Sequence, residues 1–204
     1  ILDLHPYGNA LCLVEATGQQ ILDALEMGAR KYPQTSGGFL QVSGLTYTLD
    51  PSTPSSVVLS DKGMFQRVEG PYRVSDVKVG GQPLVLDQVY TVASHNYMIK
   101  SGGDGFSMFQ DDRLLKDCTM LDNQALIGYV AEELDGLVGA AYQDPAGQDR
   151  ITILSDVSEP EPVTGTQPQD RTYTVQKGDC LWSIAARQLG AGRRWQEIYD
   201  RNRD

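Results

Sequence analysis

Hydrophobic and polar residues alternate in several short stretches of the chain, whereas two other stretches repeat their apolar residues at helical spacing. The alternation predicts strands over residues 10–16, 39–49 (one or two strands), 72–79, 88–94 and 150–154. The helical spacing predicts helices over residues 19–32 and 123–134. Because strands and helices do not alternate regularly, the pattern favours an α+β fold, a mixed sheet with packed helices, over a doubly wound parallel sheet.

Residues 155–171 interrupt this pattern. They contain three prolines, four acidic side chains and almost no large apolar residue. Such a composition cannot bury a core and predicts an extended, solvated linker. After it we expect a short strand over residues 171–175, a turn, and helices over residues 181–189 and 193–201. The chain therefore divides into a domain of residues 1–154, an acidic linker of residues 155–171 and a small unit of residues 172–204.

The charge of the chain is distributed unevenly. The net charge is -10, and residues 1–154 alone carry ten basic and 19 acidic side chains. Such a surface repels a nucleic acid polymer, which we exclude as a partner. Residues 171–204 are instead net +3, which suits an anionic cell wall. No apolar run is long enough to predict a membrane span. The start at Ile1 shows no leader pattern, so we expect a signal peptide to be either removed or outside this sequence.

Cysteines and histidines are few. Cys12, Cys118 and Cys180 match neither a disulfide framework nor a zinc pattern. Cys12 lies in a predicted strand and is expected to be a core thiol; pairing with Cys118 is the less favoured alternative. His5 and His95 are too far apart for a two-metal site and are expected at a loop or core edge. We find no nucleophilic motif and expect no cofactor in this chain.

The stretch SGGDGF, from Ser101 to Phe106, is the most informative chemical signal. Glycines at Gly102, Gly103 and Gly105 let the backbone approach a ligand closely. The carboxylate of Asp104 can accept two hydrogen bonds from a vicinal diol such as ribose. In the alternative interpretation, this side chain only fixes a turn through its own backbone.

Three segments occur in a familiar order: HPYGNALCLVEATGQQILDAL (residues 5–25), GGFLQVSGLTY (37–47) and HNYMIKSGGDGFSMF (95–109). Together they resemble the C-terminal, substrate-binding domain of the bacterial 5′-nucleotidase, 2′,3′-cyclic phosphodiesterase and UDP-sugar hydrolase family. The resemblance covers roughly residues 1–154. It implies the substrate-recognition domain of a secreted nucleotide-hydrolysing phosphoesterase, with a nucleotide or nucleoside as its ligand.

The resemblance also assigns site residues. The family holds the base between two aromatic rings and the ribose on an aspartate in the glycine loop. Phe39 matches the first ring, and Asp104, with Gly102 and Gly103 beside it, matches the ribose ligand. Asn96 matches an asparagine of the family's site. Without the resemblance, Phe39 would equally well be a core residue of a strand.

The second ring has two candidates. The family places it six residues before the aspartate, which is Met98 here, and Tyr97 lies one position earlier. On a strand these two side chains would point to opposite faces. We favour Tyr97, because the loop can absorb one residue, whereas Met98 would form a softer and less selective wall.

Two parts of the family pattern are not found in the sequence. One is an Asn-Gly-Gly-Gly-Ile-Arg-like segment upstream of the turn at Pro6, so we expect the N-terminal portion of the domain to be missing. The other is the metallophosphoesterase domain, which carries two divalent metal ions and would be this chain's partner. We therefore expect the chain alone to have no catalytic residue and to release no phosphate from nucleotides.

The segment YTVQKGDCLWSIA (residues 173–185), continued by WQEIYDRN (195–202), resembles the start of a LysM module. Its apolar residues can form a small core, Gly178 allows a tight turn and Asp179 can cap the first helix. LysM modules bind N-acetylglucosamine chains, which implies peptidoglycan as a partner and an extracellular, cell-wall-associated protein. Because the usual second strand is not in the sequence, we expect a truncated βαα unit. For this sequence we favour a partly folded remnant that binds no sugar, whereas in the full-length parent we expect the LysM module to bind peptidoglycan.

Three functions remain to be separated. The first is nucleotide recognition for a hydrolase. The second is a wall-binding, non-catalytic module whose nucleotide site has decayed. The third is a structural interaction domain that completes a partner chain through an open sheet edge. The choice among nucleoside monophosphates, cyclic nucleotides and sugar nucleotides is left open.

Overall fold

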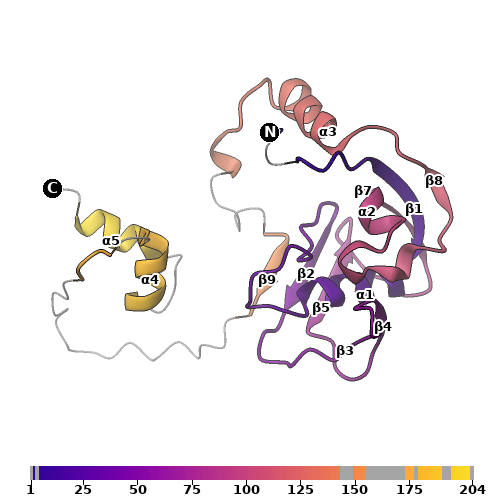
Figure 1. The fold of residues 1–204 in the computed structure, drawn as a ribbon, viewed down its shortest axis with the longest axis horizontal. Helices are drawn as coiled ribbons and strands as arrows, with labels where there is room; N and C mark the ends of the chain where they lie inside the picture. Colours follow the sequence, from indigo (N-terminus) through magenta and orange to yellow (C-terminus); the bar gives the residue numbers. More distant parts are fainter. Residues whose placement is uncertain are drawn as a thin grey trace. The chain divides into compact units, whose positions relative to one another are not determined.

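The computed structural model describes residue 2 and residues 5–142, 149–154, 173–176, 179–189 and 194–202. The chain splits into two compact units, Ile1–Ser158 and Glu159–Asp204 (Figure 1). The whole of the predicted linker, residues 155–171, lies outside the described residues.

The first sheet of the larger unit has three antiparallel strands. Strand β1 (Leu11–Thr17) lies between β7 (Val89–His95) and β8 (Leu114–Lys116). Along β1, every second residue from Cys12 to Ala16 is buried, as expected for a strand with one face on the core. The predicted strands over residues 10–16 and 88–94 are therefore confirmed.

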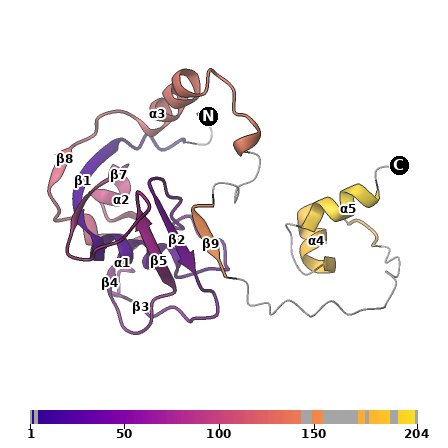
Figure 2. The same ribbon diagram turned by 180° about the vertical axis from the view of Figure 1, so that it is seen from behind.

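The second sheet has four strands in the order β6-β5-β2-β9, and Figure 2 shows β5, β2 and β9 beside one another. These are β6 (Gln82–Pro83), β5 (Val74–Val79), β2 (Leu45–Leu49) and β9 (Ile151–Ile153). Strand β9 runs parallel to β2, and the other pairs are antiparallel. The sheet is mixed, as the sequence predicts.

Helix α1 (Gly18–Ala29) joins the two sheets into one core. Thr17 caps its start through a capping box with Gln20. One set of its buried side chains, including Met27, packs with residues of β1 in a first hydrophobic cluster. A second set, including Leu25, packs with residues of β2 and β5 in a second cluster. The helix thus supplies side chains to both halves of the core.

The remaining elements of this unit are short. A hairpin of β3 (Val57–Leu59) and β4 (Phe65–Val68) forms a separate pair. Helix α2 (Asn96–Ile99) follows β7 directly, and two 3₁₀ turns come after it. Helix α3 (Asp122–Gly128) continues into a π-helical turn, Tyr129–Glu133, which agrees with the predicted helix over residues 123–134.

The sequence pattern missed four strands and overextended one. Strands β3, β4, β6 and β8 have two to four residues each, and their side chains are at least partly exposed, so they carry little alternation. Within residues 39–49, only Leu45–Leu49 forms a strand. The preceding residues, 39–44, instead form a bend over α1.

The smaller unit contains helices α4 (Leu181–Leu189) and α5 (Trp195–Arg201), close to their predicted bounds. Ile184 and Ala185 are its buried apolar residues among those described. Residues 173–176 form no strand, unlike the expected strand over residues 171–175. A single strand is stable only with a partner, and no described residue of this unit pairs with it. Among the helices that the structure describes, none has the length and apolar character to cross a membrane.

Asp179 does not cap α4, contrary to the sequence prediction. Its carboxylate accepts a hydrogen bond from the Tyr173 hydroxyl at 2.8 Å and pairs with Arg187. The hydrogen bond from the Gln176 N–H, together with the contacts from Tyr173 and Arg187, holds the pKa of Asp179 below its usual range. The residue directly before α4 is Cys180, whose backbone N–H donates to the Ser183 hydroxyl at 3.0 Å. The Asp179 side chain therefore stabilises the segment before α4 instead of capping the helix.

Candidate functional site

The segment that carries Phe39 and the glycine-aspartate loop meet at Gly38. A Cβ placed on Gly38 would lie 3.2 Å from Cβ of Asp104 and 3.6 Å from the Phe106 ring. Asp104 is exposed, and Phe39 is half-buried against the second cluster, 6.1 Å from the Tyr32 ring between centroids. The fold therefore brings Gly38, the neighbour of Phe39, close to Asp104, from which the sequence separates it by more than 60 positions.

The glycine-aspartate loop has a left-handed backbone over most of its length. The φ values are 62° at Gly102, 55° at Asp104 and 91° at Gly105. A side chain at Gly105 would collide with the carbonyl oxygen of Gly63 and lie 2.5 Å from the Met27 side chain. Asp104 tolerates the left-handed region better than most residues, but the position still stores strain. The loop thus packs tightly against Gly63 and Met27 at Gly105, whereas Asp104 is exposed to solvent.

Tyr97 and Met98 lie in different surroundings. The Tyr97 side chain is 45% exposed, and its ring covers Gly103 so closely that a Cβ there would overlap it. Met98 is only 7% exposed and belongs to the first hydrophobic cluster. Both residues fall in the helical turn α2 and not in a strand. Of these two side chains, that of Tyr97 is the exposed one, and its role as the second base wall stays a prediction.

Asn96 is partly engaged in the fold. Its side-chain oxygen accepts a hydrogen bond from the Ala10 N–H at 2.9 Å, and its own N–H donates to the Ala10 carbonyl at 2.8 Å. These bonds tie α2 to the start of β1. One acceptor site of the side-chain oxygen is thereby used within the fold, and the side-chain amide nitrogen can still donate to a ligand.

Both histidines have structural partners. His95 caps α2, because its Nδ1 accepts a hydrogen bond from the Met98 N–H at 3.2 Å. His5 lies 3.3 Å from the Asp122 carboxylate. Their places at a helix start and in a loop agree with the expectation from the sequence.

Arg30 is a site residue that the sequence did not reveal. It follows α1 directly, and its guanidinium donates to the Met27 carbonyl at 2.7 Å and to the Asp104 carbonyl at 3.4 Å. Burial lowers the pKa of Arg30, and the nearby charge of Asp104 opposes that change. No motif contains Arg30, and it lies 74 residues from Asp104, so only the fold could place it here.

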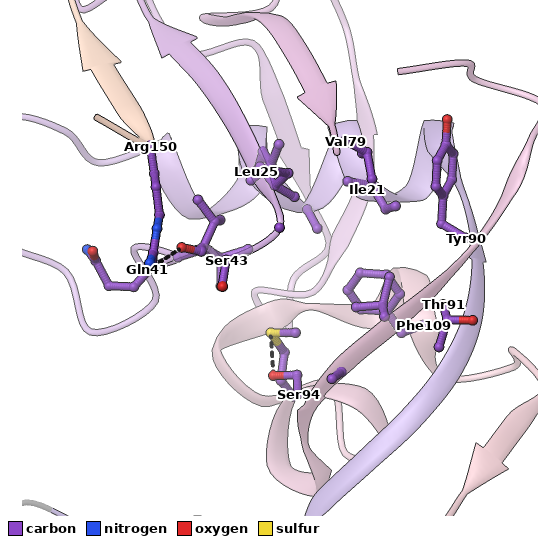
Figure 3. A pocket seen from close by; sticks show the side chains of 18 residues that line it. Ile21, Leu25, Gln41, Ser43, Val79, Tyr90, Thr91, Ser94, Phe109 and Arg150 are labelled. Carbon is purple, nitrogen blue, oxygen red and sulfur yellow. Dashed lines mark hydrogen bonds between the residues drawn. The ribbon is translucent and has the colours of Figure 1, made fainter. Parts of the chain in front are cut away.

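A cavity of about 740 Å³ lies elsewhere in this unit, and α1, residues 40–45 and strand β7 form most of its wall (Figure 3). Its lining is mainly apolar, and two of its polar side chains have partners: the Ser94 hydroxyl contacts the Met98 sulfur, and Arg150 donates to the Val42 carbonyl. Met98 lines the cavity, but Phe39, Tyr97 and Asp104 do not. The edge of β7 away from β1 has no strand partner among the described residues.

One group of possible metal ligands exists within the part of the chain that the structure describes. It consists of Cys12, Asp117 and Cys118. A hydrolytic two-metal centre uses histidines and several carboxylates to bridge its ions. This group has no histidine and one carboxylate, so it does not fit such a centre.

The amino-acid sequence of this chain is similar to those of two known families and of several known proteins. The family described as 5′-nucleotidase, C-terminal domain, matches residues 1–111, and the LysM domain matches residues 173–203. A 5′-nucleotidase of Diplobatis ommata is 30% identical over 135 residues, 65% of this chain and 22% of that protein. Cell wall protein Lmo0130 of Listeria monocytogenes is 32% identical over 131 residues, 64% of this chain and 14% of that protein.

A solved structure is also similar. The crystal structure of a 5′-nucleotidase precursor from Thermus thermophilus has a TM-score of 0.60 and 31% identity, covering 76% of this chain and 27% of that one. The chain spans about a fifth of the length of several curated relatives that it matches.

Proposed function

Because the chain belongs to the 5′-nucleotidase C-terminal domain family and ends in a LysM domain, we propose that residues 1–154 recognise the substrate of a nucleotide-hydrolysing phosphoesterase. In this proposal they bind the base and ribose of a nucleotide, and the LysM unit attaches the protein to peptidoglycan. The observation that supports it is the close approach of Gly38 to the exposed Asp104, because Phe39 follows Gly38 directly in the chain.

The base would stack on the rings of Tyr97 and Phe39. Tyr97 offers a ring that is nearly half exposed and is backed by the flat surface of Gly103. Phe39 is held from behind by the second hydrophobic cluster, so little conformational entropy is lost on binding. Stacking of one base on an aromatic side chain is worth about 1–3 kcal/mol.

The ribose would be held by Asp104. No side chain in the described part of the chain donates a hydrogen bond to this carboxylate, so both oxygens can accept from vicinal hydroxyls. Arg30 lies beside it and offsets its negative charge. A phosphate attached to the ribose would therefore meet less repulsion than the acidic surface of the unit as a whole suggests.

Bond cleavage is assigned to another part of the parent enzyme. Two divalent metal ions in a metallophosphoesterase domain would supply a metal-bound nucleophile. The described residues do not fit such a centre. The LysM unit and the similarity to a Listeria cell wall protein support an extracellular, wall-associated location.

Calorimetric titration with adenosine and AMP tests the proposal. Asp104→Asn should lower nucleoside affinity roughly tenfold or more, because a hydrogen bond to a charged group is worth about 1.5–3 kcal/mol. Phe39→Ala should weaken binding by a similar factor. Asp76→Asn is the matched control, since Asp76 is also an exposed aspartate with a positive φ, 49°. Equal affinities of the Asp104→Asn and Asp76→Asn variants would refute the assignment.

A second candidate function is favoured by the apolar cavity. Its wall includes five consecutive residues of β7, from Tyr90 to Ser94, on a strand with an open edge. Such a groove suits an extended polypeptide segment better than a polar nucleoside. Amide hydrogen exchange across β7, with and without the parent's metallophosphoesterase domain, tests this docking role. Protection that appears on mixing supports it, and unchanged exchange contradicts it.

A further inference from the structure

A local irregularity brings two cysteines together beside the first sheet. Leu13 pairs with Lys116, and the Leu11 N–H donates to the Met120 carbonyl at 2.8 Å. Three residues, Asp117 to Thr119, lie between these pairings on the side opposite the single residue Cys12, so the segment bulges at Asp117 and Cys118. The backbone of Cys118 is left-handed, with φ 47°, and its N–H points to the Cys12 sulfur at 3.4 Å.

The reactive atoms of the bulge are close. The sulfurs of Cys12 and Cys118 and a carboxylate oxygen of Asp117 all lie within 4.8 Å of one another. Both thiols are free. Cys12 is 1% exposed within the first hydrophobic cluster, whereas Cys118 is exposed to solvent.

The surroundings favour a covalent bond over a metal ion. Both oxygens of Asp117 lie 2.8 Å from the Lys100 ammonium. A cation bound here would meet that positive charge and would find at most three protein ligands. A disulfide needs no carboxylate and only a further approach of the two sulfurs, to about 2.05 Å. Cys118, on an exposed bulge, is the side free to move.

We propose that Cys12 and Cys118 are an oxidation site that forms an intramolecular disulfide. The bond staples β1 to the segment that follows β8. No role in nucleotide binding is required of it, and the two cysteines lie outside the proposed nucleoside site.

The reaction balances with a small-molecule disulfide, RSSR, as the oxidant. The exposed Cys118 thiolate attacks RSSR, which forms Cys118–S–S–R and releases one thiolate RS⁻. The Cys12 thiolate then attacks the Cys118 sulfur, which releases the second RS⁻ and forms the Cys12–Cys118 bond. Two protein protons pass to the two leaving thiolates, so two protein thiols are oxidised and one RSSR is reduced to two RSH.

The environment of Cys118 sets the rate of the first step. Its hydrogen bond to Asp117, together with some loss of hydration and a hydrogen bond to Cys12, raises the pKa of the Cys118 thiol to about 11. Because the thiolate is the nucleophile, oxidation should be slow at neutral pH and should accelerate roughly tenfold per pH unit in the alkaline range. The bond, once formed, closes a loop of about 100 residues, the length at which a disulfide restricts the unfolded chain strongly.

The test is oxidation of the full chain with oxidised glutathione, followed by thiol titration under denaturing conditions and peptide mass mapping. We expect the thiols of Cys12 and Cys118 to be lost together and a linked peptide pair that contains both and weighs two hydrogens less than the two reduced peptides. The melting temperature should rise by roughly 5–15 °C. Cys180→Ser is the matched control, because it removes the other exposed thiol, and it should keep the linked pair and the rise in melting temperature.

The Cys118→Ser variant should lose both changes. It is the safer variant because Cys118 is exposed, whereas a change at buried Cys12 risks the fold. Oxidised chain that carries glutathione on Cys118 while Cys12 stays reduced would overturn the proposal. So would stoichiometric Zn²⁺ that protects both thiols from the oxidant, because the site would then be a metal site.

Discussion

Asp104 shows what can be deduced at the level of single residues. A motif of glycines around one aspartate, together with family resemblance, predicted an exposed carboxylate next to Phe39, and the structure brings the two segments together. Arg30 could not be predicted, because its place beside Asp104 depends on long-range packing and not on spacing. The choice between Tyr97 and Met98 was open because strand alternation was assumed where a helical turn forms.

Gly103 is the residue that fixes the Tyr97 ring. Its φ lies outside the left-handed region, so Gly103→Ala strains no backbone and only pushes the ring away. We expect this variant to bind adenosine roughly fivefold more weakly or worse, because one stacking contact is lost. Gly37→Ala is the control, since a Cβ at Gly37 meets nothing within 4 Å. A titration in which both variants bind like the parent chain would show that Tyr97 is not a base wall.

At the scale of elements, helix α1 is joined to β5 by a buried polar contact. Glu26 is fully buried and accepts hydrogen bonds from the N–H groups of Arg73 and Val74, at 2.8 and 2.9 Å. The buried guanidinium of Arg73 donates to the Ala29 and Tyr32 carbonyls at the end of the helix. The sequence pattern predicted both elements, but two charged residues in the core are invisible to a pattern that reads charge as exposure.

This contact predicts a pH dependence of stability. Burial raises the pKa of Glu26, and the two backbone hydrogen bonds oppose this only partly. Because the pKa of Glu26 is higher in the folded than in the unfolded chain, the contribution of Glu26 to stability is fully present below the unfolded pKa, 4.5, and is lost as pH rises through the folded pKa. Urea denaturation should therefore show that the free energy of unfolding of the parent chain falls relative to that of Glu26→Gln as pH rises from 4.5 through the folded pKa.

The control for this pH series is Glu69→Gln, at an exposed position. Its stability curve should run parallel to that of the parent chain across the same pH range. A Glu26→Gln variant whose curve also stays parallel to the parent would contradict a raised pKa at Glu26.

The elements that the sequence missed are those without a strong apolar pattern. Strand β8 has no buried residue, and its place is set by pairing with β1. The expected strand at residues 171–175 failed for the opposite reason: its alternation is clear, but residues 173–176 have no pairing partner among the described residues. Strand formation depends on neighbours that local sequence does not contain.

At the scale of the whole molecule, residues 1–154 and residues 171–204 carry opposite net charge, -9 and +3. The proposed division of labour predicts independent binding. Full-length chain should sediment with insoluble peptidoglycan, and saturating adenosine should leave the sedimented fraction unchanged. High salt should weaken sedimentation if the basic charge contributes. A chain that stays in the supernatant at low salt would contradict wall attachment by this LysM unit.

A crystal of the chain soaked with adenosine tests whether the loops of Phe39 and Asp104 form a nucleoside site. We expect the base to lie between the rings of Phe39 and Tyr97, and both ribose hydroxyls to donate hydrogen bonds to the carboxylate of Asp104. Adenosine bound in the apolar cavity beside β7, or no bound adenosine at a concentration that saturates the protein in solution, would contradict it.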